Sequence, residues 1–126
     1  MTTMVCFEAA GTAYCLPVQA TRSVRTAEGM IALPDPASDI TGIIPGDPPL
    51  TVISPLQAQG THILVIEAGD TTFGLLVDAV TGLRRIDDAD LRPAPQGQDR
   101  PLISGTLDTA GHLVLVADPT ALAGRL

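Results

Sequence analysis

The sequence matches itself when it is shifted by 59 residues, and this internal repeat limits the folds that the chain can adopt. Residues 5–36 align without a gap on residues 64–95, and nine of these 32 pairs are identical. The identical pairs are Glu8/Glu67, Ala9/Ala68, Thr12/Thr71, Leu16/Leu75, Val18/Val77, Ala20/Ala79, Arg25/Arg84, Pro34/Pro93 and Pro36/Pro95. A duplicated unit of about sixty residues explains the match, so each half should fold in a similar way.

Each unit begins with the alternation of apolar and polar residues that is typical of β-strands. Ala10-Gly11 separates two such stretches and has the composition of a two-residue hairpin turn. That turn predicts a register in which Phe7 faces Tyr14 and Cys6 faces Cys15. The repeat predicts an equivalent hairpin in the second half, with its turn at Gly69-Asp70. Each unit then ends in a further strand pair; the expected pairs are residues 40–44 with 50–53 and residues 102–107 with 112–117.

Four or five short strands in each half predict an all-β fold of two small barrels packed together. The Pro-rich residues 33–36 and 93–101 are expected to be crossing loops, because proline has no N–H to donate to a ladder. No stretch shows a long helical period. The nearest candidates for short helices are residues 54–59 and 119–123.

Composition and charge exclude several classes of partner. The formal net charge is −7 and only 2% of the 126 residues are aromatic, which disfavours binding to nucleic-acid phosphates and bases. No apolar run approaches the roughly 20 residues that span a bilayer, and the first residues lack the basic start of a signal peptide. We therefore expect a cytoplasmic protein that neither binds nucleic acid nor inserts into membranes.

Residues that could carry catalysis are few and scattered. His62 and His112 lie at strand starts, one in each repeat, without a second His or Cys at metal-ligand spacing. Cys6 and Cys15 are expected as cross-strand neighbours, either as inert buried thiols or as a redox pair. The sequence therefore predicts no enzyme, no cofactor and no metal site. A small-ligand-binding or catalytic barrel around the histidines is the alternative.

Several stretches resemble the CheW-like domain family. In the second half these are FGLLVDAVTGL at residues 73–83 and HLVLVADPTAL at residues 112–122. In the first half, residues 33–36 and the strand at residues 40–44 resemble the crossing loop of the family and the strand that follows it. The resemblance covers nearly the whole chain, and GLLVDAV is its most specific piece.

The resemblance implies one CheW-like domain over residues 1–126, built of two five-stranded SH3-like barrels that are related by a pseudo-twofold axis. The approximate repeat halves are 1–60 and 61–126, and strands could be exchanged between the barrels. The function that it implies is a non-enzymatic adaptor of a chemosensory pathway, recruited to membrane receptor arrays. The implied partners are the regulatory domain of a CheA-type histidine kinase, the cytoplasmic tip of chemoreceptors and other CheW-like domains.

The sequence departs from the family pattern at two places. Family members usually have an Asn-Leu-Arg-Gly turn after the strand at residues 40–44, whereas this chain has PGDPP at residues 45–49. The Arg of that turn is missing, and Asp47 stands near its place with the opposite charge. Thr21 and Ser23 stand where the family commonly has an apolar residue and an acid. These changes favour, as an alternative, a self-associating or capping module that does not couple the kinase.

The candidate protein-binding residues are taken from these two places. They are Thr21, Arg22, Ser23, Val24, Pro45, Gly46 and Asp47. A core position is the alternative for Val24. In the second half, Gly74, Gly105 and Asp78 are expected to serve the fold, the glycines through close backbone approach or bulges and the aspartate through local hydrogen bonds.

Overall fold

The strands follow one another in an order that repeats once along the chain, β1–β6 and then β7–β12. A computed structural model describes residues 1–33, 38–93, 102–109 and 111–126. The elements are β1 (Thr2–Ala9), β2 (Thr12–Pro17), η1 (Val18–Ala20), β3 (Thr21–Thr26), β4 (Ile31–Ala32), β5 (Ile40–Ile44), β6 (Leu50–Ile53), β7 (His62–Ala68), β8 (Thr71–Val77), β9 (Ala79–Ile86), η2 (Asp88–Asp90), β10 (Leu91–Pro93), β11 (Ile103–Thr109), β12 (His112–Ala117) and α1 (Pro119–Ala123). Within this described part, no helix has the length and apolar character that a membrane crossing needs.

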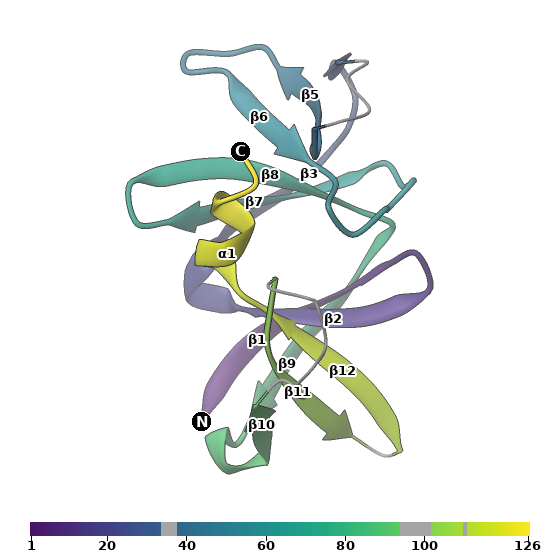
Figure 1. Cartoon of the computed structure of the whole chain (residues 1–126), viewed down its shortest axis with the longest axis vertical. Helices are drawn as coiled ribbons and strands as arrows, with labels where there is room; N and C mark the ends of the chain where they lie inside the picture. The colour runs from purple at the N-terminus through teal and green to yellow at the C-terminus, as the bar shows by residue number, and fades with distance from the viewer. Residues whose placement is uncertain (34–37, 94–101, 110) are drawn as a thin grey trace.

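The strands form two sheets, which Figure 1 shows as two barrels stacked along the long axis of the molecule. Sheet A has the order β10-β11-β12-β2-β1-β9, and sheet B has the order β3-β7-β8-β6-β5-β4. The all-β fold of two small barrels is therefore confirmed. Each sheet has six strands rather than five, because the short strands β10 and β4 extend the ladders at one end.

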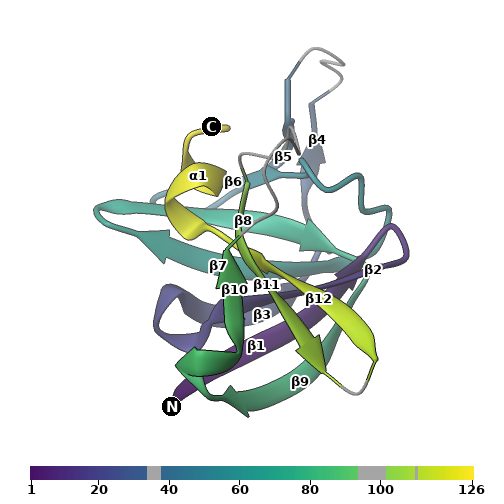
Figure 2. The ribbon, with the colours of Figure 1, turned by 60° about the horizontal axis from the view of Figure 1, so that its bottom comes forward.

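Each sheet takes strands from both halves of the chain. The hairpin β1–β2 lies between β9 and β12 in sheet A, and the hairpin β7–β8 lies between β3 and β6 in sheet B. In both sheets the second strand of the hairpin pairs in parallel with the next strand of the sheet: β2 pairs with β12, and β8 pairs with β6. In Figure 2 the β1–β2 hairpin lies between β9 and the β11–β12 pair, which come from the second half of the chain. Neither half of the repeat therefore forms a sheet by itself. The hairpin at the start of each half pairs with strands from the other half.

The predicted register of the first hairpin is confirmed. The turn residues Ala10-Gly11 have φ angles of 50° and 79°, as a two-residue type I′ turn requires. Across the hairpin Phe7 pairs with Tyr14, and Cys6 pairs with Cys15. The rings of Phe7 and Tyr14 stack, with their centroids 5.5 Å apart.

One apolar core joins the two sheets. It contains side chains from both hairpins, among them Phe7 and Leu16 from sheet A and Phe73 and Leu75 from sheet B. The helix α1 adds Leu122, which is fully buried. A second, smaller cluster lies on the other face of the β1–β2 hairpin; its buried members are Met4, Cys15, Ile86, Leu107 and Val116. The first hairpin is therefore covered on both faces.

The two short helices that the sequence suggested have different outcomes. Residues 119–123 form α1, and the side chain of Asp118 caps it by accepting from the N–H of Thr120 at 3.0 Å. Residues 54–59 form a turn and irregular backbone instead, so that prediction is wrong. The reason is local, because Gln57 has a φ of 60°, which a right-handed helix excludes. The expected crossing loops lie outside the described residues except for Leu33 and Pro93.

Gly74 and Gly105 serve close packing, as expected. A Cβ atom at Gly105 would lie 2.6 Å from the carbonyl oxygen of Arg92 on the neighbouring strand β10. The register of β11 against β12 also shifts between Ile103 and Gly105, which marks a β-bulge. At Gly74 the added atom would lie 2.7 Å from Cγ2 of Ile63. Both positions therefore exclude larger side chains.

Candidate protein-binding surfaces

Four of the predicted binding residues lie on β3, an outermost strand of sheet B. In that sheet β3 has β7 as its neighbour and forms one end of the strand order. The helix η1 leads into the strand, and the hydroxyl of Thr21 donates to the carbonyl oxygen of Val18 at 2.9 Å. Outermost strands present backbone N–H and C=O groups to which a partner chain can add a strand. The β3 edge is therefore a suitable surface for binding a protein.

A β-bulge in β3 sets the direction of Arg22. The register of β3 against β7 shifts between Thr21 and Ser23, so Arg22 is the extra residue. Its guanidinium donates to the carboxylate of Glu67 on β7 and forms an ion pair with it. Because the Arg22 side chain is 62% exposed, this pair contributes only about 0–1 kcal/mol to stability. Its main effect is to hold the arginine against the sheet.

Val24 is exposed, so the alternative of a core position is wrong. The residue is 49% exposed, although its pairing partner Leu64 on β7 is fully buried. The cause is the position of β3 at the end of the sheet, where no further strand covers that flank in the described residues. The repeat aligns Val24 on Leu83, which is 69% exposed on β9, the outermost strand of sheet A. Leu83 was not among the predicted residues, although the 59-residue shift points to it.

The altered turn at residues 45–49 joins β5 to β6 and is exposed throughout. Asp47 is followed by a cis peptide bond to Pro48. In sheet B the strands β7 and β8 separate β3 from β6, and Figure 1 shows the turn at the upper end of the molecule. The structure therefore does not bring Pro45, Gly46 and Asp47 together with the β3 residues. The two groups form separate surfaces.

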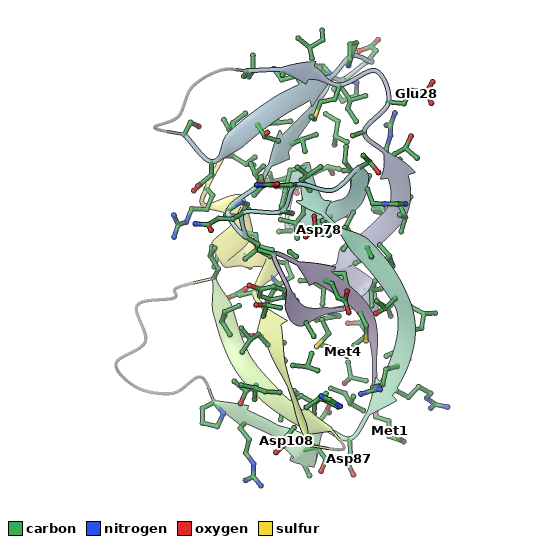
Figure 3. The ribbon with its side chains drawn as sticks, turned by 90° about the vertical axis from the view of Figure 1, so that its right-hand side faces the viewer. Met1, Met4, Glu28, Asp78, Asp87 and Asp108 are labelled. Carbon is green, nitrogen blue, oxygen red and sulfur yellow. The ribbon has the colours of Figure 1, made fainter. Side chains whose placement is uncertain are left out.

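Asp78 fixes the place where the chain crosses from sheet B to sheet A, between the two barrels in Figure 3. Its Oδ2 accepts from the N–H of Ala10 at 2.7 Å, and its Oδ1 accepts from the N–H of Gln59 at 2.9 Å. Its own N–H donates to the carbonyl oxygen of Glu8 at 2.9 Å. One carboxylate thus ties the first hairpin turn to the segment between β6 and β7. The expected structural role of Asp78 is confirmed. Its hydrogen bonds are not local, however, because they join residues that lie 19 and 68 positions away in the sequence.

Replacing Asp78 by alanine is expected to lower the free energy of unfolding by about 2 kcal/mol, because two N–H groups lose a charged acceptor. Asp78→Asn should cost less, since the amide keeps one oxygen. Asp70→Ala, in the exposed turn of the β7–β8 hairpin, is the matched control and should leave stability nearly unchanged. Urea unfolding measures all three variants. Equal stability of the Asp78→Ala and Asp70→Ala variants would contradict the assigned role.

The histidines lie in different sheets. His62 begins β7 in sheet B, and His112 begins β12 in sheet A. The Nδ1 atom of His62 is buried and lacks a hydrogen-bond partner in the described residues. Over these same ranges, no group of three His, Cys, Asp or Glu side chains is placed to hold a metal ion. The geometry gives no support to a catalytic barrel centred on either histidine.

The family model of the CheW-like domain matches residues 48–126, which is well over half of the chain. The chain belongs to the CheW-like domain family. Among solved structures, this CheW-like domain is similar to the scaffolding protein TtCheW from Thermoanaerobacter tengcongensis, with a TM-score of 0.81 and 22% sequence identity. The alignment covers 93% of this chain and 84% of that chain, and it shows that the two share a fold. None of the curated proteins matches the chain.

All seven predicted binding residues precede the segment that the family model matches. Four lie in β3, and three lie in the turn at residues 45–49, directly before Pro48, where the match begins. The family match therefore carries no argument for the role of these residues in this CheW-like domain. Their role depends on exposure and on their place in the sheet.

Proposed function

We propose that this CheW-like domain is a non-enzymatic adaptor of a bacterial chemosensory pathway, which joins chemoreceptors to a CheA-type histidine kinase. Membership of the CheW-like domain family is the observation that carries the proposal. The fold that the chain shares with a scaffolding protein supports the same class of function. The adaptor would act in the cytoplasm, at receptor arrays, without a cofactor.

The β3 edge is the proposed contact for the regulatory domain of the kinase. Val24 supplies an exposed apolar side chain there, and the backbone of an outermost strand lies beside it. Apolar side chains at the centre of an interface and backbone groups at its sheet edge are the two features that β-strand addition uses. Thr21 and Ser23 are small polar residues that leave this edge accessible, and Arg22 stays paired with Glu67. The edge can therefore accept a partner strand without losing a buried contact of its own.

The exposed turn at residues 45–49 is the proposed second contact. Asp47 places a negative charge near the position where the family commonly has an arginine. An acidic group on the partner would be repelled there, so binding through this turn is expected to be weaker than in a domain with the family arginine. A partner with a basic group at that place would instead be favoured.

Calorimetry with the regulatory domain of a chemosensory kinase from the same cell tests the adaptor function. We expect micromolar binding by the unmodified chain and tighter binding by the Asp47→Arg variant. Asp70→Arg is the matched control, because it makes the same charge change at another exposed turn. Equal gains in both variants would show that only net charge matters. Absence of binding by every sample would contradict the proposed kinase contact.

A self-associating or capping module is the second candidate function, and the charge of Asp47 is the observation that favours it. In that case the altered turn prevents kinase binding, while barrel-to-barrel contacts with other CheW-like domains persist. Sizing over a range of concentrations separates the two functions. The capping module forms concentration-dependent oligomers and binds the kinase only after Asp47→Arg, whereas the adaptor binds it unmodified.

A further inference from the structure

The β1–β2 hairpin places two cysteines directly opposite each other in a defined type of pair. The type I′ turn Ala10-Gly11 is flanked by Ala9 and Thr12, which pair directly beside the turn. In such a hairpin the flanking residues form a hydrogen-bonded pair, and hydrogen-bonded and non-hydrogen-bonded pairs then alternate along the ladder. Three pairs further from the turn, Cys6 and Cys15 form a non-hydrogen-bonded pair. The Cα atoms of such a pair are about 4.5 Å apart.

This spacing allows a disulfide bond. Disulfides join residues whose Cα atoms are roughly 4.4–6.8 Å apart and whose Cβ atoms point the same way. Directly opposed residues of an antiparallel pair project to the same face of the sheet, so the side chains of Cys6 and Cys15 lie together. Both pack with the small apolar cluster of sheet A, and both are free thiols. The ladder therefore already holds the two sulfur atoms in reach of each other.

We propose that Cys6 and Cys15 form a dithiol site that low-molecular-weight disulfides oxidise to a cross-strand disulfide. The Cys6 thiolate attacks a disulfide RSSR, forms a mixed disulfide with one sulfur and releases RS⁻. The Cys15 thiolate then attacks the sulfur of Cys6, the Cys6–Cys15 bond forms and the second RS⁻ leaves. The two thiol protons of the protein end on the released thiols. The protein loses two electrons, and RSSR is reduced to two RSH.

Cys6 is the residue that reacts first. Cys15 is only 1% exposed, whereas Cys6 is half-buried. On its other side Cys6 pairs with Gly82 of β9, and a Cβ atom added at Gly82 would meet no atom within 4 Å. A small disulfide can therefore approach Cys6 over this glycine. Oxidation also leaves the β3 edge unchanged, so the site is independent of the proposed adaptor function.

The rate of the exchange should depend on pH. Burial raises the pKa of the Cys6 thiol, and burial together with the charge of the neighbouring Cys6 raises the pKa of Cys15 to about 12. The positive charge of Arg84 offsets part of both increases. Because the thiolate is the nucleophile, the rate should rise by roughly tenfold for each pH unit between neutral and mildly alkaline solution. The site therefore responds to sustained oxidation and reacts slowly at neutral pH.

Incubation of the native full chain with oxidised glutathione tests the proposal, with alkylation of free thiols and mass spectrometry as the readout. We expect a monomer that has lost two hydrogen atoms and no longer alkylates. The Cys15→Ser variant should stop at the mixed disulfide of Cys6 with glutathione. The Cys6→Ser variant should react at least about tenfold more slowly, because the remaining thiol is buried.

Two outcomes would overturn the proposal. One is a native chain that accumulates the mixed disulfide at Cys6 without closing the Cys6–Cys15 bond. The other is a chain whose thiols become oxidised only after it is unfolded in urea. Kinase binding of the oxidised chain is measured in parallel, and it is expected to equal that of the reduced chain. A failure of oxidation and a failure of kinase binding are therefore observed separately.

Discussion

The Phe73→Ala variant is expected to lose about 4 kcal/mol of unfolding free energy, which is a large part of the roughly 5–15 kcal/mol that stabilises a domain. The Phe73 side chain is fully buried in β8, in the core that both sheets share. Removing the ring leaves a cavity in this shared core, and neighbouring side chains fill such a cavity only in part. Both barrels should therefore be destabilised by one substitution.

Urea unfolding followed by circular dichroism measures this effect. We expect one cooperative transition in the unmodified chain and in the variant, at a lower urea concentration in the variant. Phe73→Leu is the matched control and should lose about 1–1.5 kcal/mol, since it conserves most of the apolar volume. Two separate transitions, of which Phe73→Ala moves only one, would show that the barrels unfold independently and would contradict the shared core.

The Val24→Glu variant is expected to weaken binding of the kinase regulatory domain at least about tenfold, which corresponds to roughly 1.4 kcal/mol. A carboxylate at the centre of the β3 edge would have to be desolvated when a partner covers the strand. Stability should change little, because Val24 is already 49% exposed. Calorimetry measures the binding, and urea unfolding checks the fold.

The internal repeat supplies the matched control for this variant. Leu83 is the equivalent of Val24 on the outermost strand of the other sheet, and it is 69% exposed. Leu83→Glu should leave kinase binding within about twofold of the unmodified chain, which is below 0.5 kcal/mol. An equal loss in both variants would mean that both edges bind the partner or that neither is the contact.

Local features of the sequence predicted most of the fold. Ala10-Gly11 supports a two-residue turn, and this turn alone sets the register that pairs Phe7 with Tyr14. The alternation of apolar residues predicted the strand pairs, with β5, β6 and β12 matching their expected bounds. The helix prediction for residues 54–59 failed because composition does not reveal the left-handed conformation of a residue such as Gln57.

The exposure of a strand residue depends on strand order, which local patterns do not encode. Val24 has the alternation of a core residue, yet it is exposed because β3 ends the sheet. For the same reason the sequence could not show that residues 45–49 lie apart from β3, since β7 and β8 enter the sheet between them from the second half of the chain. The bonds of Asp78 to Ala10 and Gln59 likewise depend on the exchange of hairpins between the sheets.

Co-sedimentation with receptor-containing membranes tests the adaptor function most directly. Full-length chemosensory kinase is mixed with membranes that carry chemoreceptors from the same cell, with and without the unmodified chain. We expect the kinase to sediment with the membranes only when the chain is present, and the chain to sediment with them in either case. A kinase that stays in the supernatant while the chain binds the membranes, or a chain that binds neither, would contradict an adaptor that joins the two.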